Sequence, residues 1–430
     1  MNLEERIKEL EEENKGLKET VLALTKRIEE LEELVKEKSR PVFIKEEIIH
    51  RHAKTGQKEG HLGISRTIPD KIDEVKELKE DSCRFCGSHV GDTIEVRRRY
   101  VVDIPEVKAV TTEYVIHRRY CKHCKKVVEP SVPALPRARF GLRLMLLVLL
   151  LKLDKRMPSK QITSFLEVQY GLKLSDGEVY GMLRQLAEAF GSYYEEIKEK
   201  IKSALVKHSD ETGWRENGKN RWLWLFINKE VALYLIREKR SSKVPAAELG
   251  DQQGNTVISD RLNAYTQLAK VSGCTQQICW AHILRESGRL AELYPEARYV
   301  HKRLKTIYAT ACSYNHSATA AQKEQLLHWI DVIATSRTYQ NTSVYKFVKS
   351  ICRKHHDNLF RFVDNPEIES TNNCAEQGLR HAVVMRKISN GSRSAQGAET
   401  TAQLLSITRT IKMNAQNPMD FMMNWLQKGK

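Results

Sequence analysis

The chain has 430 residues, more than the ~100–200 residues of a usual domain, so several domains are expected. Hydrophobic residues make up 41% and charged residues 29% of the sequence, as in soluble globular proteins, and a mean hydropathy of −0.51 argues against a membrane protein. The net charge of +16 is uneven, because residues 1–37 hold seven Lys/Arg against twelve Asp/Glu and the remainder carries +21. That remainder favours nucleic acid as a partner over a membrane surface, although a merely soluble basic protein is the simpler alternative.

Two features of the sequence argue against membrane insertion and secretion. The longest apolar run, Leu142–Leu151, is interrupted by Arg143 and is much shorter than the ~20 residues that cross a bilayer, so it predicts a buried helix. The N-terminus, Met1-Asn2-Leu3-Glu4-Glu5, lacks the basic start and apolar core of a signal peptide. We therefore expect a cytoplasmic protein with no membrane partner.

Residues 1–38 carry a seven-residue repeat. Leucines recur at that interval, namely Leu3, Leu10, Leu17, Leu24 and Leu31. A second series lies four residues after each leucine, namely Ile7, Asn14, Val21, Ile28 and Val35. The pattern predicts a parallel two-stranded leucine zipper in which Asn14 fixes register and dimer state. The alternative is an amphipathic helix that packs on its own domain. The apolar face of such a helix repeats every 3.6 residues, so it does not keep a strict seven-residue repeat. Residues 39–70 are polar and basic and predict a linker or a DNA-tracking arm.

Residues 71–137 predict a zinc-binding module. Four of the nine cysteines form two Cys-x-x-Cys pairs, Cys83 with Cys86 and Cys121 with Cys124. Two strand-like runs, Thr93–Val102 and Thr112–Tyr120, lie between the pairs. Four thiolates close a tetrahedral Zn²⁺ site without an open position, which makes a structural role the expected one. A redox dithiol, which needs only one pair, and free core cysteines are the alternatives. Basic residues crowd the same segment and suggest phosphate contacts.

Residues 138–200 predict a helix-turn-helix. Ser159 is a candidate N-cap for a first helix, Gly171 ends it, and Ser175 with Glu178 forms a capping box for a second helix. Such a unit can present its second helix to a major groove. Helical hairpins are common, so a purely structural role remains open.

Residues 201–290 change to strand periodicity. Strands are expected over Ala204–Asp210, Trp222–Asn228 and Val231–Arg237, followed by a helix, Ser241–Leu249. The pattern then continues with a strand, a helix and a strand over Thr256–Asp260, Ala264–Lys270 and Gln276–Trp280. Three strands followed by alternating helix and strand predict an RNase H-like sheet, in which the first and fourth strands are neighbours.

Two acids are expected at the centre of this sheet. Asp210 ends the first strand and Asp260 ends the fourth. Adjacent buried carboxylates are costly unless they bind cations, and hard oxygen ligands suit Mg²⁺ or Mn²⁺. Two such ions about 3.5–4 Å apart catalyse in-line phosphoryl displacement. Glu376, on a helix opened by Ser370-Thr371-Asn372-Asn373, is the candidate third carboxylate. Composition alone leaves open that all three are ordinary surface acids.

Several linked motifs carry a family resemblance. Four strings stand out: His208-Ser209-Asp210-Glu211-Thr212-Gly213-Trp214, Ile258-Ser259-Asp260-Arg261, Cys279-Trp280-Ala281-His282, and Asn372-Asn373-x-Ala375-Glu376-x-x-Leu379-Arg380. The zipper, the Gly60-His61-x-Gly63 segment, the cysteine pairs and the basic tract Arg386-Lys387-x-x-x-Asn390-Gly391-Ser392 occur in the same order. From the zipper to about Thr410, the chain resembles the DDE transposases of the insertion sequence sixty-six family.

The resemblance implies roles for individual residues. Asp210, Asp260 and Glu376 would form the catalytic, metal-binding triad that holds two Mg²⁺ or Mn²⁺ ions, supported by His282, Asn373 and Arg380. Glu211 competes for the first position, but adjacent side chains on a strand point to opposite faces. The Cys279-x-x-His282 pair matches a motif of many DDE enzymes, and either a structural turn or a part in catalysis is open. These two side chains alone cannot make a zinc site.

The expected fold class is multidomain α+β, with an N-terminal coiled coil, a zinc-binding module, a helix-turn-helix and an RNase H-like α/β catalytic core with a helical insertion. The first part of the core spans residues 201–290, the insertion 291–365, and the second part with the C-terminal helices 366–430. Similarity to the family implies that the insertion contacts the transposon end.

The expected function is DNA transposition. The enzyme would bind the terminal inverted repeats of an insertion sequence, hydrolyse a phosphodiester and join the freed 3′ end to target DNA. Its partners would be transposon ends, target DNA, a second copy or higher oligomer through the zipper, and companion proteins of the same element. A dimeric zinc-containing DNA-binding regulator with an inactive RNase H-like core is one alternative, and a nuclease that does not join strands is another.

Overall fold

The computed structural model describes residues 15–16, 18–21, 23–25, 27, 30, 69–414 and 417–428. These belong to two units, Met1–Ile104 and Pro105–Lys430, each considered by itself. The described residues between 15 and 30 are helical, and the side chains of Val21 and Leu24 are 61% and 58% exposed. The coiled coil stays a prediction, because the other zipper residues lie outside the described residues, namely Leu3, Ile7, Leu10, Asn14, Leu17, Ile28, Leu31 and Val35.

The first unit contains a tight turn around the first cysteine pair. The backbone amide of Cys83 donates to the carbonyl of Ser88 at 2.8 Å, and Gly87 closes the turn with a φ of 76°. An isolated antiparallel bridge joins Ser82 to His89 on either side. The sequence Cys83–Cys86 therefore occupies a short chain reversal that brings its ends together.

The two strands predicted between the cysteine pairs are wrong in extent. Residues 93–102 form no strand, and within 112–120 only the last two residues do. The strands observed are β1 (Arg119–Cys121) and β2 (Lys126–Val128), which pair antiparallel across a four-residue turn, so that Cys121 ends β1 and Cys124 lies in the turn. An alternating apolar pattern becomes a strand only when another strand supplies hydrogen-bonding partners, and the described residues offer none to residues 93–102.

A helical layer opens the second unit after β2. It comprises α2 (Leu142–Leu149), the π-helical turn η1 (Leu150–Asp154), α3 (Ser159–Tyr170), α4 (Asp176–Ala189) and α5 (Gly191–Ser203). The predicted buried helix is α2, in which Met145, Leu146 and Leu149 are fully buried. Among the described helices, none combines the length and the apolar character needed to cross a membrane.

The predicted helical hairpin is α3 and α4. Gly171 ends α3 in the left-handed conformation, with a φ of 64°, and Ser175 and Glu178 form the reciprocal capping box of α4, as expected. The expected N-cap was wrong by one residue: Pro158 holds that position and Ser159 is the first helical residue. The hydroxyl of Ser159 instead accepts a hydrogen bond from Lys152 at 3.3 Å.

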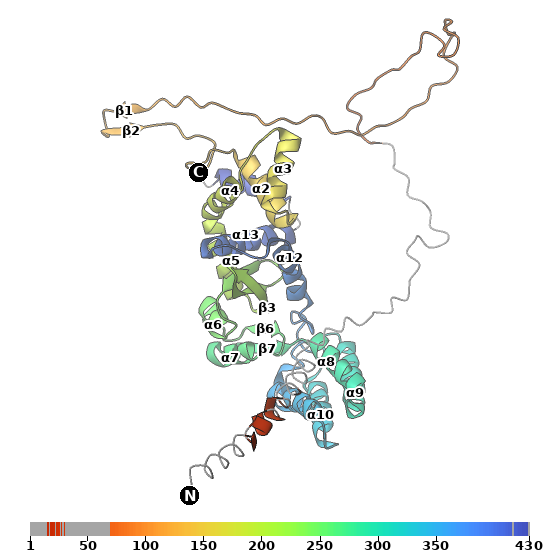
Figure 1. Cartoon of the computed structure of the whole chain (residues 1–430), viewed down its shortest axis with the longest axis vertical. Coiled ribbons are helices and arrows are strands. Elements are labelled where there is room, and N and C mark those ends of the chain that lie inside the picture. Colours follow the sequence, from red (N-terminus) through yellow and green to blue (C-terminus); the bar gives the residue numbers. More distant parts are fainter. Residues whose placement is uncertain are drawn as a thin grey trace. The chain divides into compact units, whose positions relative to one another are not determined.

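The centre of the second unit is a five-stranded mixed sheet (Figure 1). Its strands are β3 (Val206–Glu216), β4 (Lys219–Ile227), β5 (Ala232–Arg237), β6 (Thr256–Ser259) and β7 (Thr275–Ile278), in the spatial order β5-β4-β3-β6-β7. β3 pairs antiparallel with β4 and parallel with β6. The expectation that the first and fourth strands are neighbours is confirmed.

The first strand is longer than predicted. It does not end at Asp210 but continues to Glu216 and returns through Asn217 and Gly218, whose φ values are 48° and 75°. A two-residue turn with two positive φ angles matches the twist of a hairpin, and Asn-Gly is the preferred pair for it. Asp210 therefore lies in mid-strand opposite Leu225, directly after the segment that pairs with β6.

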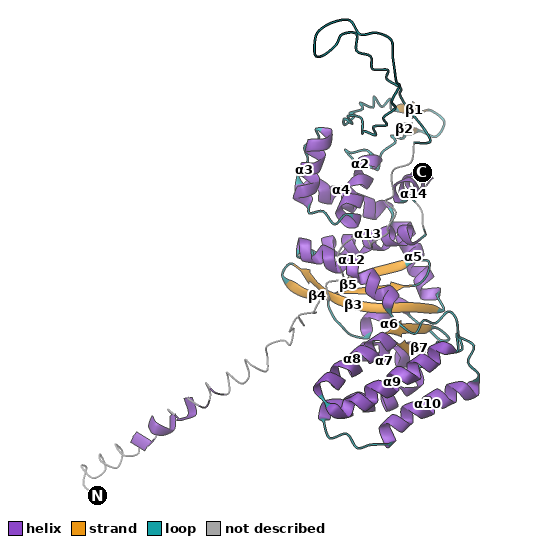
Figure 2. Cartoon of the chain, turned by 90° about the vertical axis from the view of Figure 1, so that its right-hand side faces the viewer, coloured by secondary structure: helices purple, strands orange, loops and turns teal. Residues whose placement is uncertain are grey.

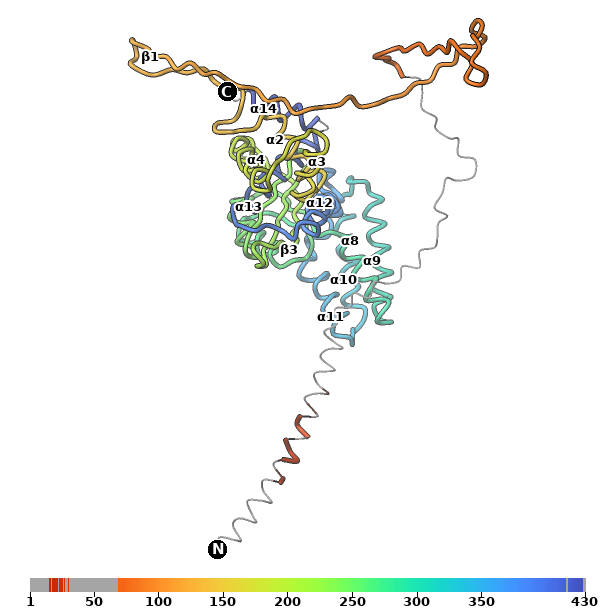
Figure 3. The backbone as a smooth tube through the Cα atoms, turned by 45° about the horizontal axis from the view of Figure 1, so that its top comes forward, coloured from red at the N-terminus to blue at the C-terminus, as the bar shows by residue number. Residues whose placement is uncertain are grey.

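Helices cover both faces of the sheet (Figure 2). Helix α12 (Asn373–Ser389) packs against β3 and β4, and α13 (Ala395–Met413) and α5 pack against β5. On the opposite side, α7 (Asn263–Ser272) contacts β7 and packs against α6 (Lys243–Leu249). The C-terminal helix α14 (Pro418–Lys428) packs on α2 and α13. Figure 3 shows the late helices α12 and α13 beside the early helices α2 to α4. The hydrogen bond from the Gln403 amide to the Ala187 carbonyl, 2.7 Å long, is one tie between them.

A second helical core lies beside β6 and β7. It contains α8 (Trp280–Leu293), α9 (Pro295–Ser313), α10 (Ala320–Thr335), α11 (Thr342–Lys349), the π-helical turn η2 (Ser350–Lys354) and the short 3₁₀ helix η3 (His356–Asn358). Its buried side chains include Trp280, Leu304, Ile330 and Phe360. Residues 291–365 are thus mostly helical, as their pattern predicts.

Gly378 lets α12 lie close to β4. A Cβ at this position would be 2.6 Å from Leu225 Cδ2, well inside van der Waals contact. Gly378→Ala should therefore lower the free energy of unfolding by about 1–3 kcal/mol, because the helix must move away from the strand. Gly181→Ala, in helix α4 with open space around the new Cβ, is the matched control and should raise stability by about 0.5–1 kcal/mol. Urea unfolding of both variants checks the pair, and equal effects would contradict this packing argument.

Candidate active site

Asp210 lies at the middle of the sheet among other acids. Burial raises its pKa to about 7, and the neighbouring carboxylates of Glu211, Asp260 and Glu376 act in the same direction. The backbone amide of Glu211 opposes this shift by donating to Asp210 Oδ1 at 2.9 Å. A carboxylate held this way gains from any cation placed beside it.

The neighbouring acid Glu211 already has hydrogen-bond partners, although burial raises its pKa. Its carboxylate accepts two hydrogen bonds from Arg240, at 2.6 and 2.8 Å, and a third from the hydroxyl of Tyr265, which belongs to α7. Its side chain is only 1% exposed. Strand alternation sends this side chain toward α7, so Glu211 has fewer free lone pairs for a ligand than Asp210 has.

Asp260 follows directly after β6, the parallel neighbour of β3. Its Oδ1 accepts the backbone amide of Leu262 at 2.8 Å, which fixes the turn into α7. The remaining carboxylate oxygen has no hydrogen bond within the described part of the chain. Asp260 is near enough to Asp210 for its charge to raise the pKa of Asp210.

Glu376 is in the first turn of α12, and Asn372 fixes that helix to the sheet. The Asn372 side chain is fully buried, donates to the carbonyl of Ser209 at 2.9 Å, and contacts His208 Nδ1 at 3.1 Å. Asn372 therefore holds the start of α12 against the two β3 residues that immediately precede Asp210. Oε1 of Glu376 is buried and has no hydrogen-bond partner among the described residues.

These groups open into one cavity of about 630 Å³. Asp210 and Glu376 line it, as do the neighbouring acid Glu211 and the three residues predicted to support the acids, His282, Asn373 and Arg380. Asp260 is not among the lining residues, and its link to the group is its charge effect on Asp210. The structure thus brings together one acid from β3, one from the end of β6 and one from α12, which are separated by up to 166 positions in the sequence.

The basic tract after α12 has a structural role that the sequence did not indicate. Arg386 donates to the carbonyl of Gly213, and the amide of Ser392 donates to the carbonyl of Arg215 at 2.8 Å. Gly391, with a φ of 94°, lies so close to Arg215 that a side chain could not fit. The tract therefore clamps the far half of β3, the half that the strand prediction omitted.

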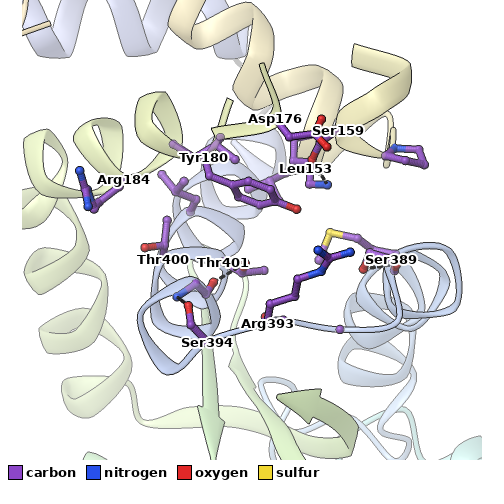
Figure 4. Close-up of a pocket in the computed structure, with 18 of the residues that line it drawn as sticks. Leu153, Ser159, Asp176, Tyr180, Arg184, Ser389, Arg393, Ser394, Thr400 and Thr401 are labelled. Atoms are coloured by element: carbon purple, nitrogen blue, oxygen red, sulfur yellow. Dashed lines mark hydrogen bonds between the residues drawn. The ribbon is translucent and has the colours of Figure 1, made fainter. Parts of the chain in front are cut away.

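A second cavity, of about 760 Å³, lies between the α3–α4 hairpin and the α12–α13 connection (Figure 4). Tyr180 and Arg393 extend into it. Its charged lining is mainly basic, with Lys152, Lys160, Arg184 and Arg393 against Asp176. Nothing in the sequence pattern pointed to this grouping, because its members come from separate elements.

The four zinc-ligand candidates fall in different units. Cys83 and Cys86 belong to the first unit, and Cys121 and Cys124 belong to the second. Backbone amides around each turn lower the pKa of the Cys86 and Cys121 thiols, as in turns that present thiolates to a metal. The four-cysteine zinc site remains a prediction.

Asp210→Asn should stabilise the ion-free protein at high pH. The pKa of Asp210 is about 7 in the folded state and lies near 3.8 in the unfolded chain, so its contribution to stability is full below about pH 4 and is lost as the pH rises through 7. Asparagine carries no charge, so the gain of the variant over the wild type should grow to at most about 4 kcal/mol near pH 8. Urea unfolding in EDTA from about pH 4 to about pH 8 measures it. A difference independent of pH would contradict the assigned burial cost.

Comparisons with known proteins identify the family of the chain. One curated relative is an "Uncharacterized protein y4hP" from Sinorhizobium fredii (strain NBRC 101917 / NGR234), which is 21% identical over 408 residues and aligns with 83% of this chain and 72% of its own length. The family model described as "Transposase IS66 family" matches residues 137–400. That match includes the whole five-stranded sheet, all three acids and the acidic cavity, together with most of the lining of the basic cavity. The chain belongs to the IS66 family of transposases.

Proposed function

We propose that this transposase cuts DNA at the ends of its element and joins the freed ends to target DNA, with Asp210, Asp260 and Glu376 as the catalytic carboxylates. The observation that carries the proposal is the convergence of these acids: Asp210 and Glu376 line one cavity, and Asp260 follows the strand beside that of Asp210. Such a cluster is unstable by itself and becomes favourable with divalent cations. Family membership supplies the DNA substrate class.

The donor set fits Mg²⁺ or Mn²⁺. Carboxylate oxygens are the ligands that these ions prefer, and Oε1 of Glu376 is a buried acceptor without a partner in the described part of the chain. When bound, a pair of such ions activates the attacking oxygen and stabilises the leaving oxygen of an in-line phosphoryl transfer. Asp210, Asp260 and Glu376 would hold them.

The side chains around the acids would orient the substrate. Arg380, in the lining of the same cavity, suits a phosphate oxygen of the DNA backbone, and Asn373 can donate to a second. In the first reaction, water attacks a phosphodiester and frees a 3′ hydroxyl. In the second, that hydroxyl attacks a phosphodiester of the target strand and displaces its 3′ oxygen. No covalent bond between protein and DNA is required.

The strand order supports an RNase H-like catalytic core. Three antiparallel strands followed by two parallel ones, with the first strand central, make the first and fourth strands adjacent. This order brings Asp210 and Asp260 near each other without help from the rest of the chain. The regulator with an inactive core would not need such a convergence of acids.

DNA recognition would use the parts outside the acidic cavity. The basic cavity between the α3–α4 hairpin and the α12–α13 connection suits backbone phosphates, with Lys152, Lys160, Arg184 and Arg393 as the cations. The zinc module and the helix-turn-helix would add contacts to the terminal repeats. A zipper between two copies would hold two DNA ends in one complex.

Asp210→Asn, Asp260→Asn and Glu376→Gln should each reduce Mg²⁺-dependent cleavage of end-containing DNA by at least about 10³-fold, because each removes a charge that binds the ions. Asp251→Asn, an exposed carboxylate in the same unit, is the control and should keep full activity. Cleavage of labelled duplex DNA measures both. Wild-type activity in all three triad variants would refute the proposal and favour the inactive regulator. A pre-cut 3′-hydroxyl end that is never joined to target would favour the simple nuclease.

Cys83→Ser should lower the zinc content, the stability and the DNA affinity of the full chain while leaving the acidic site chemically intact. The reason is that a structural Zn²⁺ site loses its geometry when one of four thiolates is removed. Metal analysis and cleavage of DNA at saturating protein concentration test the two halves of this expectation. Unchanged zinc content would exclude the four-cysteine site.

A further inference from the structure

Cys279, His282 and Glu376 converge although they come from two separate helices. Cys279 is the N-cap of α8, His282 is in its first turn, and Glu376 is in the first turn of α12. One ligand atom from each side chain lies within 4.8 Å of the other two. The sequence pattern shows only the Cys-x-x-His pair, and two ligands are too few for a metal site. The fold adds a third candidate ligand, Glu376, which is 94 positions after His282 in the chain.

The facing atoms of this cluster are unsatisfied. His282 Nδ1 and Glu376 Oε1 are 3.4 Å apart and both are buried, yet neither forms a hydrogen bond within the described residues. In tetrahedral zinc sites, bonds of about 2.0–2.3 Å separate the ligand atoms by about 3.3–3.8 Å. The nitrogen and the oxygen already have that separation, so an ion between them would satisfy two atoms that the protein leaves without partners.

Backbone amides prepare the sulfur for a metal. Cys279 is fully buried, and the amide of Asn372 donates to its Sγ at 3.1 Å. Amide donors to sulfur stabilise a metal-bound thiolate in the same way as second-shell contacts stabilise other ligands.

We infer that Cys279, His282 and Glu376 form a three-ligand site for a thiophilic divalent ion of the Zn²⁺ class, separate from the four-cysteine module and sharing Glu376 with the site proposed for Mg²⁺. Sulfur and imidazole select Zn²⁺ over Mg²⁺, which binds oxygen almost exclusively. Three protein ligands leave one coordination position of a tetrahedral ion open. Because Glu376 is common to both sites, an ion held by Cys279 and His282 would compete with Mg²⁺ for this carboxylate.

The test is zinc binding by the full chain, with Zn²⁺ alone as the probe and metal content measured after dialysis against a zinc buffer. Cys279→Ala and His282→Ala should each lose one ion per chain and weaken that ion's binding by more than about tenfold. Cys352→Ala, another buried cysteine in the same unit, is the matched control and should keep the wild-type content. Thermal unfolding of each variant verifies that it folds. If Cys279→Ala does not fold, His282→Ala tests the site in its place, because the His282 side chain is 34% exposed.

Co²⁺ substitution gives a second readout, since the thiolate-to-cobalt absorption band should decrease in Cys279→Ala and remain unchanged in Cys352→Ala. Equal zinc content in wild type and His282→Ala would overturn the inference, as would an equal loss in Cys352→Ala. Asp210→Asn separates the two proposals, because it removes none of these three ligands. It should retain the zinc ion while losing cleavage, so either proposal can fail without the other.

Discussion

Repulsion among buried carboxylates is the constraint on which the site depends. Asp210 lies in mid-strand at the centre of the sheet, and its pKa rises to about 7 because burial and nearby acids oppose its ionisation. A protein keeps such a group only if the surrounding structure fixes it in place. The long β3–β4 hairpin, the parallel pairing with β6 and the anchoring of α12 together provide that support.

Asn372 shows how the support is transmitted. Its side chain bonds to residues of β3, and its backbone amide bonds to Cys279 at the end of β7. One buried residue, through its side chain and its backbone amide, therefore ties together the strand of Asp210, the start of α8 and the start of α12. Because Glu376 is one turn into α12, the position of the third acid depends on this contact. The catalytic set proposed here and the metal site inferred beside it share the same anchor.

The two cavities of the second unit suit different roles, one in catalysis and one in DNA binding. The acidic one faces the sheet, and the basic one lies between the α3–α4 hairpin and the connection from α12 to α13. Helix α12 contributes residues to both, with Glu376 near its start and Ser389 at its end. A DNA backbone held by Arg393 and Lys152 would therefore be bound to the same helix that carries an acid of the proposed triad. Binding of the DNA and placement of the acid would be mechanically linked.

Local signals in the sequence were sufficient for the order of strands and helices, the capping box of α4, the end of α3 and the adjacency of the first and fourth strands. These features could be predicted from hydrophobic periodicity and from turn and capping residues, because such signals depend only on residues a few positions apart. The same signals ended β3 too early and predicted strands over residues 93–102, because the length of a strand depends on the partner that pairs with it. Tertiary structure alone decided that Arg386 clamps β3, that four cations gather in one cavity, and that Glu376 meets Cys279 and His282. Those contacts join residues far apart in the chain, and no local pattern encodes which distant side chains will share one buried space.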